Sequence, residues 1–311
     1  MTTLLEMHYE KIHDPRPKIA ISFSGGRTSA VMTKLLLDQK KDTHNMVVVF
    51  ANTGCEHEGT LKFIKDCDDY WGFNTVWVEA TRSQKIGVGT RHKIVTFDTA
   101  SRNGEPYEEA VKKHGIFNPA RPACTVLLKT QAMESYLKSI GFLRGKKLNY
   151  ETAIGIRSDE IDRISINKEK QKFIYPLIDL NFTKDDVFNF MQSAPFDLNI
   201  PEHMGNCTWC WKKSIRKLCL IARKNPEVFD FPKTMEKKYG KHDRVKWTSD
   251  FLKEKGKLTF FRNGLSAEDI LKMSMDDKYA PIQQNEFLFD EFLDKSSSCA
   301  ESCEVYPTDG S

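Results

Sequence analysis

Two glycines, three hydroxyl side chains and one arginine lie together in the segment Ser24-Gly25-Gly26-Arg27-Thr28-Ser29. Glycine lets the backbone bend around an oxyanion, so that N–H groups and hydroxyls can point at the anion. Arg27 adds a free-standing cation that can pair with phosphate. The Gly-Lys-Ser/Thr ending of a Walker loop and the third glycine of a dinucleotide-binding turn are both missing. The segment predicts a phosphate-binding loop of another kind, with an ordinary strand-to-helix turn as the alternative.

Cysteines form a second set of residues that could do chemistry. Cys207 and Cys210 have the spacing Cys-x-x-Cys, which lets both sulfurs converge on one metal ion or cluster. Cys124 follows a segment that two prolines keep extended, and it directly precedes a predicted helix whose N-terminal amides can stabilise a thiolate. We expect Cys124, Cys207 and Cys210 to be ligands of one centre.

Other uses of these cysteines stay open. A structural zinc ion could be held by Cys124, Cys207, Cys210 and either His203 or Cys219. A redox pair is less favoured, because no thioredoxin-like pattern surrounds the Cys-x-x-Cys. Eight cysteines in a chain without a visible export signal favour metal ligands, redox groups or buried apolar side chains over a disulfide framework.

A charged segment, Arg157-Ser158-Asp159-Glu160, follows the apolar run Ala153-Ile154-Gly155-Ile156. The run is typical of a strand, so the charged side chains are expected at the C-terminal edge of a sheet, where open parallel sheets bind ligands. Arg157 could pair with a phosphate at that edge. A surface loop of ion pairs is the alternative.

Strand and helix patterns alternate along the chain, which favours an α/β fold with a doubly wound, open parallel sheet and right-handed crossovers. The run Met46 to Phe50 is continuous and β-branched, as in strands buried on both faces. Residues 81–104 have little periodicity and many charges, so we expect a loop-rich insertion there. Further strands are expected before Ser24, at 75–79 and at 151–156, and helices from the Gly-Gly loop to 38–42, at 60–71, at 105–114 and at 125–139.

Two loops, Ser24 to Ser29 and Asn52 to Glu56, each follow a predicted strand. In open parallel sheets, the C-terminal ends of the strands border the crevice in which ligands bind. We therefore expect both loops at one edge of the sheet.

Charge is unevenly distributed in this chain of 311 residues, whose net charge is +4. Residues 211–262 hold 16 Lys and Arg against 6 Asp and Glu, whereas residues 263–311 hold 3 against 11. The basic block suits a nucleic-acid substrate near the Cys-x-x-Cys, or an acidic tail that folds back on it; two solvated surfaces are the alternative. The basic residues nearest the Cys-x-x-Cys are Lys212, Lys213, Arg216 and Lys217.

The expected division of the chain is a nucleotide-binding domain at 1–191, a basic, mainly helical region at 192–262, and an acidic segment and tail at 263–311. No apolar run approaches the roughly 18 residues that a membrane-spanning helix needs. The first residues lack a basic start followed by an apolar stretch. We expect a cytoplasmic protein without a membrane partner, and a homodimer is left open.

Four landmarks, in order between Ile19 and Val187, resemble the phosphoadenosine phosphosulfate reductase-like branch of the ATP pyrophosphatase (PP-loop) superfamily, which includes sulfur-transferring relatives and reductase-like proteins that bacteriophages carry. Asn52 stands where these relatives have Asp, and Leu180-Asn181-Phe182 stands where they have a single Trp. The landmarks are Ser-Gly-Gly-x-x-Ser at Ser24, Asn52-Thr53-Gly54-Cys55-Glu56, Gly155-Ile156-Arg157-Ser158-Asp159-Glu160, and Tyr175-Pro176-Leu177-Ile178-Asp179 followed by Thr183 and Asp186.

The resemblance implies that the chain binds ATP or a related adenine nucleotide together with Mg²⁺. It places Arg157, Asp159 and Glu160 beside the nucleotide as catalytic groups. The residues that it implies for nucleotide binding are Ser24, Gly25, Gly26, Arg27, Thr28, Ser29, Asn52, Thr53 and Gly54.

A cofactor is implied as well. In iron–sulfur adenylyl-sulfate reductases, a Cys-Cys pair and a later Cys-x-x-Cys hold a 4Fe-4S cluster, whereas this chain has Ala123-Cys124 in place of the pair. Cys124, Cys207 and Cys210 would leave one iron open. That arrangement resembles the cluster of tRNA-thiolating ATP pyrophosphatases, in which an open iron can carry sulfur to an adenylated substrate.

Three functions are compatible with these observations. The first, which we favour, is an ATP-dependent transferase that adenylates a substrate and modifies it by sulfur transfer at the cysteine site. The second is a phosphoadenosine phosphosulfate or adenylyl-sulfate reductase; such enzymes end in a segment similar to Glu-Cys-Gly-x-His, and Cys303 in Glu301-Ser302-Cys303-Glu304 is the candidate nucleophile, although Gly and His are missing. The third is a non-catalytic, nucleotide-sensing or partner-binding protein.

Overall fold

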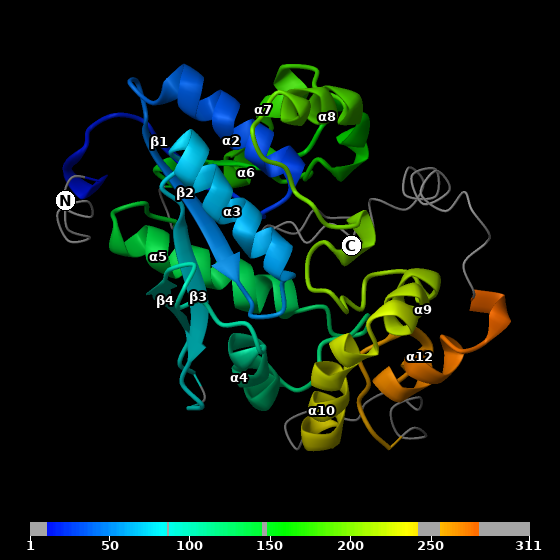
Figure 1. Cartoon of the computed structure of the whole chain (residues 1–311). Coiled ribbons are helices and arrows are strands. Elements are labelled where there is room, and N and C mark those ends of the chain that lie inside the picture. The colour runs from blue at the N-terminus through cyan, green and yellow to red at the C-terminus, as the bar shows by residue number, and fades with distance from the viewer. Residues whose placement is uncertain (1–10, 86, 145–147, 242–255, 280–311) are drawn as a thin grey trace.

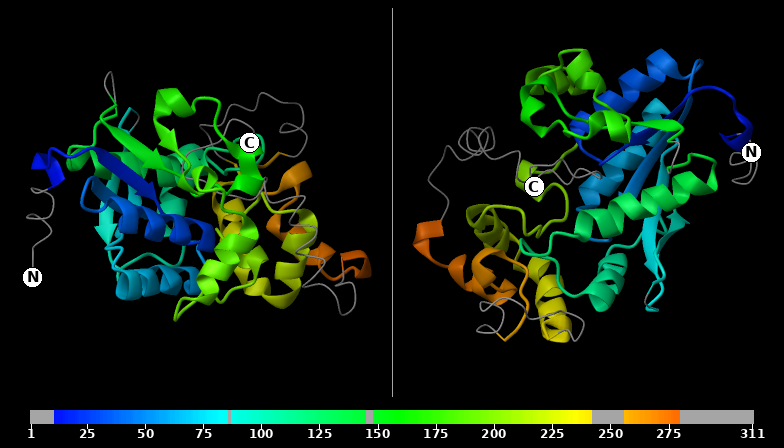
Figure 2. Two further views of the ribbon diagram at one scale, coloured as in Figure 1. Left: turned by 90° about the horizontal axis from the view of Figure 1, so that it is seen from above. Right: turned by 180° about the vertical axis from the view of Figure 1, so that it is seen from behind.

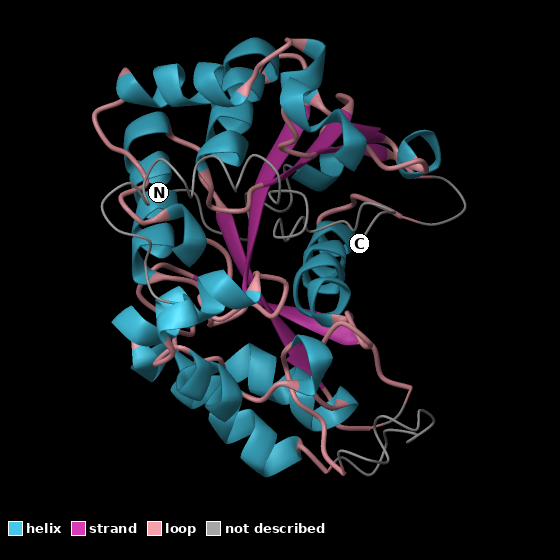
Figure 3. Cartoon of the chain, turned by 90° about the vertical axis from the view of Figure 1, so that its right-hand side faces the viewer, coloured by secondary structure: helices cyan, strands magenta, loops and turns pink. Residues whose placement is uncertain are grey.

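The computed structural model describes residues 11–85, 87–144, 148–241 and 256–279. Within these residues, six strands form one sheet in the order β4-β3-β2-β1-β5-β6, and helices flank it (Figure 1, Figure 3). The strands are β1 Lys18–Ser22, β2 Asn45–Asn52, β3 Val76–Arg82, β4 Thr90–Val95, β5 Tyr150–Ala153 and β6 Phe173–Ile174. The α-helices are α2 Arg27–Lys40, α3 Glu58–Trp71, α4 Glu105–His114, α5 Gln131–Ser139, α6 Lys168–Gln171, α7 Pro176–Asp179, α8 Lys184–Gln192, α9 Ile215–Lys224, α10 Asp230–Tyr239 and α12 Ala267–Met273. A π-helix, η1 Thr125–Thr130, precedes α5, and the short 3₁₀ segments are η2 Ser158–Arg163, η3 Glu202–Met204, η4 Pro226–Phe229, η5 Arg262–Gly264 and η6 Asp277–Tyr279.

The described sheet is parallel except at one edge. Strands β3, β2, β1, β5 and β6 run parallel to one another, and β4 pairs antiparallel with β3. Side chains alternate between the two faces, so that Ile19 and Ile21 of β1 face one core cluster and Ala20 faces the other. All eight residues of β2 are buried, which explains its continuous apolar sequence. The predicted α/β fold with a doubly wound sheet is confirmed.

The helices divide between the two faces of the sheet (Figure 1). Helices α2, α3 and α8 pack on the face that carries Ile19 and Ile21. Helices α4, η1 and α5 pack on the opposite face, where the core continues into the C-terminal region. Figure 2 shows the yellow and orange helices of that region, α9, α10 and α12, grouped at one end of the molecule. The C-terminal region therefore shares a core with one face of the sheet.

Residues 81–104, which we expected to be a loop-rich insertion, contain a strand. All six residues of β4 pair with β3. Because β4 lies at the edge of the sheet, its exposed positions carry the charged side chains of Arg91 and Lys93, which discourage pairing with another chain. These charges also mask the alternating apolar pattern of a strand, so β4 was not predicted, whereas residues 83–85, 87–89 and 96–104 lie outside strands and helices as expected.

The C-terminal region is held to the sheet by aromatic side chains. The ring of Trp209 lies 5.1 Å from that of Tyr107 in α4 and 5.0 Å from that of Phe260. Helix α12 contacts both α9 and α10. A mainly helical C-terminal region is confirmed for the described residues, while domain boundaries at 191 and 262 stay predictions. No described helix combines the length and the apolar character that a bilayer-spanning helix requires.

A buried carboxylate joins three parts of this region. Glu236 of α10 accepts hydrogen bonds from the backbone N–H groups of Phe260 and Ala267, each at 3.0 Å. Ala267 begins α12, so the carboxylate also faces a helix N-terminus. Burial raises the pKa of Glu236 to about 7, although the two backbone hydrogen bonds oppose the shift.

Stability should therefore depend on pH through Glu236. The ordinary pKa of the carboxyl is 4.5, so its contribution to the free energy of unfolding is complete below that pH and is lost as the pH rises through about 7. We expect the difference in unfolding free energy between the native chain and Glu236→Gln, measured by chemical denaturation, to be more favourable to the native chain at about pH 5 than at about pH 8.

The matched control is Glu268→Gln, which changes a solvent-exposed glutamate on α12. Its difference from the native chain should not vary with pH in this way. A difference for Glu236→Gln that is equal at both pH values would contradict the effect of burial on the Glu236 carboxyl.

Candidate functional site

The loop between β1 and α2 brings together the residues predicted to bind phosphate. Gly26 is the residue before α2, and Ser29 lies in the first turn of that helix. The hydroxyl oxygens of Ser24 and Ser29 are 3.0 Å apart, and the Ser29 hydroxyl also donates to the carbonyl of Gly26 at 3.0 Å. The hydroxyls and the N-terminal N–H groups of α2 form the polar surface that suits an anion. Nucleotide binding at this loop stays a prediction.

The first glycine of the loop is required by its conformation and its surroundings. Gly25 has a φ of +80°, and a Cβ atom there would lie 2.8 Å from side-chain atoms of Ile64 and Thr60 in α3. At Gly26 the nearest atom to such a Cβ would be 3.8 Å away. Only the first position is therefore closed to other residues by the close approach of α3.

Arg157, which follows β5, reaches the loop that is predicted to bind phosphate. Its Nη1 donates to Oγ1 of Thr28 at 3.2 Å. The same guanidinium pairs with Asp159, with 2.9 Å between Nε and Oδ1, and lies 3.5 Å from Oε2 of Glu160. Glu160 is buried and also pairs with Arg163. The structure thus brings the three predicted catalytic residues of this segment to the N-terminus of α2, with Glu160 bound inside an ion-pair network.

Arg27 is not the free-standing cation that we expected. Its Nε and Nη2 pair with the two carboxylate oxygens of Asp197 at 2.7 and 3.0 Å, and Nη2 donates to the carbonyl of Leu198 at 2.6 Å. Burial opposes ionisation of Asp197, but the hydrogen bonds that its carboxylate accepts lower its pKa. The bidentate pair fastens the segment after α8 to the loop. A contact between Arg27 and a phosphate stays a prediction.

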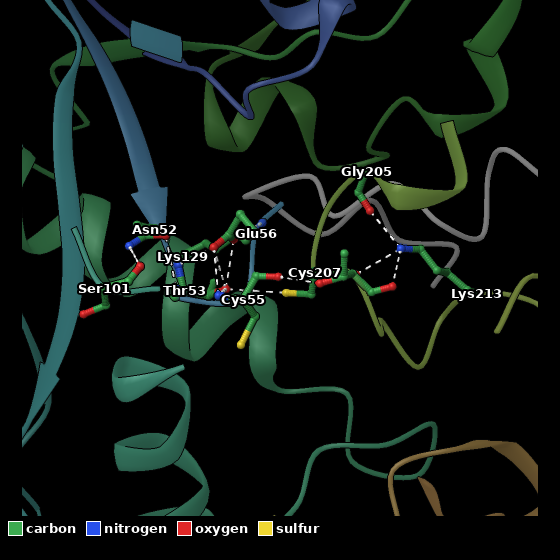
Figure 4. Close-up of polar contacts among 11 residues, drawn as sticks. Asn52, Thr53, Cys55, Glu56, Ser101, Lys129, Gly205, Cys207 and Lys213 are labelled. Carbon is green, nitrogen blue, oxygen red and sulfur yellow. Dashed lines mark hydrogen bonds and ion pairs between the residues drawn. The ribbon is translucent and has the colours of Figure 1, made fainter. Parts of the chain in front are cut away.

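Asn52 ends β2 and is fully buried. Its Nδ2 donates to Oε1 of Glu79 at 2.7 Å and to the carbonyl of Ser101 at 2.9 Å, and its Oδ1 accepts from the N–H of Gly54 at 3.1 Å. Both amide hydrogens are therefore used to join β2, β3 and the segment before α4. Figure 4 shows the contact with Ser101. A role of Asn52 and Gly54 in binding the nucleotide stays a prediction.

The carboxylate of Glu56 organises the remainder of the loop after β2 (Figure 4). It accepts hydrogen bonds from the backbone N–H groups of Thr53 at 3.0 Å and Cys55 at 3.2 Å, and from the Thr53 hydroxyl at 2.9 Å. Lys129 of η1 lies 3.8 Å from Glu56, and the side chains of Lys129 and Glu56 are only 7% and 2% exposed. A buried carboxylate requires such partners, so Glu56 holds the strand end and the π-helix together.

The Cys-x-x-Cys segment docks on the same loop. Cys207 forms an isolated antiparallel bridge with Glu56, and the carbonyl of Cys55 accepts hydrogen bonds from the N–H and the hydroxyl of Thr208 at 3.1 and 3.3 Å. The Sγ of Cys207 is 3.5 Å from Oγ1 of Thr53. The candidate nucleotide edge and the candidate thiol site therefore share one loop, as Figure 4 shows.

Lys213 holds the Cys-x-x-Cys turn from inside the protein. Its side chain donates from Nζ to the carbonyls of Gly205, Cys207 and Thr208 at 2.9, 3.0 and 3.0 Å, and the residue is 2% exposed. Lys217 is also buried, at 6% exposed. The expectation that these two lysines face a nucleic acid is wrong, because the ammonium of Lys213 is needed to satisfy buried carbonyls and Lys217 lies on the inner face of α9.

One pocket contains all three cysteines predicted as metal ligands. Burial raises the pKa of the Tyr107 hydroxyl well above its ordinary value, and electrostatic repulsion from the nearby cysteines, first Cys124, adds to the shift. The cysteines among the described residues form no disulfide. The pocket is lined by Thr53, Tyr107, Cys124, Thr125, Leu128, Lys129, Cys207, Trp209, Cys210 and Trp211.

The donor atoms of this pocket suit a soft metal, because thiols predominate and no carboxylate lines it. Across the part of the chain that the structure describes, however, no group of three or more His, Cys, Asp or Glu side chains is arranged to hold a metal ion. The three thiols share a pocket without forming a complete ligand set, so they would have to turn toward a metal. His203 and Cys219, the alternatives for a fourth zinc ligand, are not among the lining residues.

Cys55 is a further buried cysteine beside the Cys-x-x-Cys segment, and the spacing of the cysteines in the sequence did not predict its position. Burial raises the pKa of the Cys55 thiol well above its ordinary value, and neighbouring Cys207 and Glu56 add to the shift. A signal was present, because Cys55 lies in the loop after the second predicted strand, where ligand sites gather. Cys299 and Cys303, by contrast, lie outside the described residues.

Comparison with known proteins gives a consistent result. Residues 18–199 match the family described as Phosphoadenosine phosphosulfate reductase domain. The uncharacterized nin region protein ORF290 of Escherichia phage lambda is 31% identical over 292 residues, which are 92% of this chain and 94% of that protein. An uncharacterized protein of Methanocaldococcus jannaschii is 30% identical over 173 residues, which are 54% of this chain and 27% of that protein.

A solved structure was also found to be similar. It is the U34-tRNA thiolase NcsA from Methanococcus maripaludis with its 4Fe-4S cluster. The similarity covers 77% of this chain and 78% of that chain, with 14% sequence identity and a TM-score of 0.32.

Gly25→Ala should destabilise the chain and weaken ATP binding. The left-handed backbone alone costs a non-glycine residue about 1–2 kcal/mol, and the new Cβ would also collide with Ile64 and Thr60. The matched control for the melting temperature is Gly26→Ala, where the same methyl group makes only an ordinary van der Waals contact, 3.8 Å from Oγ of Ser24. Thermal unfolding and isothermal titration with ATP measure both effects. Equal melting temperatures for the two variants would show that Gly25 is not constrained as described.

Lys213→Met should loosen the Cys-x-x-Cys turn. The change keeps an apolar stem but removes the donor to three carbonyls, and each buried acceptor left unpaired costs about 1–3 kcal/mol. We expect a lower melting temperature and faster reaction of Cys207 and Cys210 with a thiol reagent. Lys212→Met, at the neighbouring, more exposed lysine, should leave stability within about 0.5 kcal/mol and thiol reactivity unchanged. Equal thiol reactivity in both variants would contradict the role of Lys213.

Proposed function

The chain belongs to the phosphoadenosine phosphosulfate reductase domain family, and from this premise we propose that it is an ATP pyrophosphatase-type transferase that adenylates an acceptor and then transfers sulfur to it. The observation that carries the proposal is the loop Thr53 to Glu56, which lies at the strand ends and also docks Cys207. In support, β1 and β2 are parallel neighbours, so the predicted phosphate-binding loop and the loop that contacts Cys207 follow strand ends at the same edge of the sheet.

In the proposal, the loop after β1 binds the nucleotide. In the proposal, the hydroxyls of Ser24 and Ser29 and the N-terminal N–H groups of α2 hold the phosphates of ATP, which arrives with Mg²⁺. Arg157 is already hydrogen-bonded to Thr28 in that loop. Its guanidinium would therefore need little movement to neutralise charge that develops on the phosphates, and Asp159 fixes its orientation.

The proposed reaction has two displacements. An oxygen of the acceptor attacks the α-phosphorus of ATP; the bond from this phosphorus to the oxygen that bridges it to the β-phosphorus breaks, and pyrophosphate leaves. A sulfur nucleophile then attacks the adenylated carbon, the carbon–oxygen bond breaks, and AMP leaves with the oxygen and its electron pair. With sulfur supplied at the oxidation level of sulfide, neither step requires an oxidant or a reductant.

Cys124, Cys207 and Cys210 are proposed to hold a 4Fe-4S cluster, with zinc as the alternative. When bound, a cluster would supply a place to hold sulfur near the nucleotide edge. The proposal is supported by the three thiols on one pocket and by the aromatic side chains of Tyr107 and Trp209 that exclude water from it. The protein's own contribution is to orient these thiols through the bridge to Glu56 and through Lys213.

A sulfonucleotide reductase is the second candidate, because the matched family carries that description. Its nucleophile would be Cys303, outside the described residues, and a thiol reductant would have to complete each turnover. A nucleic-acid acceptor and a homodimer stay predictions. With Lys213 and Lys217 buried, any nucleic acid would have to use other residues of the basic block.

Two assays separate the candidates. In the first, anaerobic protein reconstituted with iron and sulfide is incubated with α-labelled ATP and total tRNA, and a transferase should release pyrophosphate and AMP in equal amounts. In the second, phosphoadenosine phosphosulfate and a dithiol are supplied, and a reductase should release sulfite. Arg157→Ala should abolish whichever activity is present. Release of neither product with any acceptor, although ATP binds, would favour a nucleotide-sensing protein.

The cluster is tested separately. Cys207→Ser should lower bound iron and acid-labile sulfide but leave ATP binding unchanged, because the phosphates bind at another loop. The matched control is Cys67→Ser, which makes the same change at a fully buried cysteine of α3 on the opposite face of the sheet. If the native protein is colourless and contains stoichiometric zinc, the site holds zinc and not an iron–sulfur cluster.

A further inference from the structure

Residues 194–206, which we call the strap, lead from α8 to the Cys-x-x-Cys and are attached to the loop before α2 (Figure 1). The attachment is the bidentate pair between Arg27 and Asp197, together with the hydrogen bond from Arg27 to the carbonyl of Leu198. The two paired side chains are 34% and 27% exposed. Ion pairs that water reaches shift an equilibrium by about two- to fivefold. The strap is therefore held to the loop by a contact that another anion can replace.

The first half of the strap packs on α3. The ring of Phe196 lies 4.7 Å from that of Trp71 at the end of the helix. Ile200 is 8% exposed, and a Cβ atom at Gly59, near the start of the helix, would lie only 2.5 Å from its Cγ2. Asp197 therefore lies between two apolar contacts that keep it beside the N-terminus of α2.

The second half of the strap leads into the Cys-x-x-Cys turn. Met204 is buried in the same core cluster as Cys207. The carbonyl of Gly205 accepts a hydrogen bond from Lys213, whose ammonium also holds the turn. Only six residues lie between Leu198 and Gly205, and three of them form η3. A displacement of the strap at the loop is therefore passed to the turn by a short stretch of chain.

An anion bound at the loop would compete with Asp197 for Arg27. Arg27 is the first residue of α2, and helical side chains lean toward the N-terminal end of their helix, where the N–H groups attract anions. A phosphate group accepts the same paired hydrogen bonds from a guanidinium as a carboxylate does. Its negative charge would also repel the Asp197 carboxylate. A diphosphate carries more charge than one carboxylate and gains contacts with the loop, so it should win the guanidinium.

We propose that the pair of Arg27 and Asp197 is a latch through which the loop before α2 controls the Cys-x-x-Cys turn. While Arg27 holds Asp197, the strap keeps Cys207 and Cys210 buried, at 7% and 5% exposed. A diphosphate group at the loop draws Arg27 away from Asp197, which loosens the strap and opens the turn. The cysteines thus become accessible when a nucleotide is in place. The inference rests on the proposed function, since the diphosphate is part of ATP or is the product pyrophosphate.

Hydrogen exchange measures the opening without modifying a cysteine or removing a bound metal. The N–H groups of Met204, Thr208 and Cys210 each donate to a backbone carbonyl, so their exchange with deuterium reports the opening of the strap and the turn. The probe is inorganic pyrophosphate with Mg²⁺, and the full chain is used as purified. Saturating pyrophosphate should speed exchange at these three positions about two- to fivefold. Exchange in α5 should not change.

Asp197→Asn removes the negative charge and keeps the size of the side chain. Without pyrophosphate, its strap and turn should already exchange about two- to fivefold faster than those of the native chain, and pyrophosphate should add nothing. Because coupling between two equilibria is reciprocal, the variant should bind pyrophosphate more tightly by a similar factor in isothermal titration. The matched control is Asp14→Asn, which makes the same change at the bidentate pair with Arg16 before β1 and should behave as the native chain does.

Several outcomes would overturn the latch. If the native chain binds pyrophosphate and exchange in the strap and the turn does not rise, the pair is only a structural contact, even where Asp197→Asn speeds exchange. Equal or weaker binding of pyrophosphate by Asp197→Asn would exclude the competition for Arg27. If Asp197→Asn does not fold, the response of the native chain to pyrophosphate decides.

The latch and the proposed function can fail separately. A response to pyrophosphate without release of pyrophosphate from ATP with any acceptor would leave the latch standing and refute the transferase. A transferase whose strap and turn do not respond to pyrophosphate would refute the latch alone. If neither pyrophosphate nor ATP binds, both are refuted.

Discussion

The buried carboxylate of Glu56 is the interaction on which the arrangement of the site depends. A charge this far from water is stable only when hydrogen bonds and an opposite charge surround it, and removal of one partner of such a pair typically costs about 3–5 kcal/mol. Its partners come from the loop after β2 and from Lys129 of η1, and its backbone pairs with Cys207. Glu56 therefore holds a strand end and a π-helix together through its carboxylate, and the Cys-x-x-Cys through its backbone.

Two different chemical environments lie at this edge of the sheet. The loop before α2 is polar. The hydroxyls of Ser24 and Ser29 contact each other, and the hydroxyl of Thr28 accepts a hydrogen bond from Arg157. The thiol pocket, a short distance along the edge, is walled by rings such as those of Tyr107 and Trp209, which are 5.1 Å apart. The first environment offers hydroxyls and N–H groups to an anion, whereas in the second the charge of Lys129 is paired with that of Glu56. The loop Thr53 to Glu56 follows β2 at this edge and contacts Cys207.

The sequence predicted the elements that have strong local signals. Helix α4 has the predicted bounds, Glu105–His114, because Gly104 and Gly115 stop the helix on both sides, and β2 was recognised from its continuous apolar run. Features that depend on distant partners could not be predicted. Arg27 pairs with Asp197, 170 residues away, and nothing in the loop before α2 reveals this. Lys213 is buried because its ammonium donates to three carbonyls, which are brought together only when the turn folds. The sequence of β4 does not look like a strand, because its exposed positions carry charges.

The π-helix η1 shows why the pocket could not be predicted from the sequence. A helix was expected from Thr125 to Ser139, and the structure begins it with six residues of π-helix. This form is rare, and it is frequent at functional sites. Here it carries Lys129 to Glu56 and leaves the hydroxyl of Thr125 without a partner among the described residues. A rare helix form, a buried ion pair and two donors without a partner among the described residues therefore meet at one pocket, and such departures from local preference are expected at functional or strained sites.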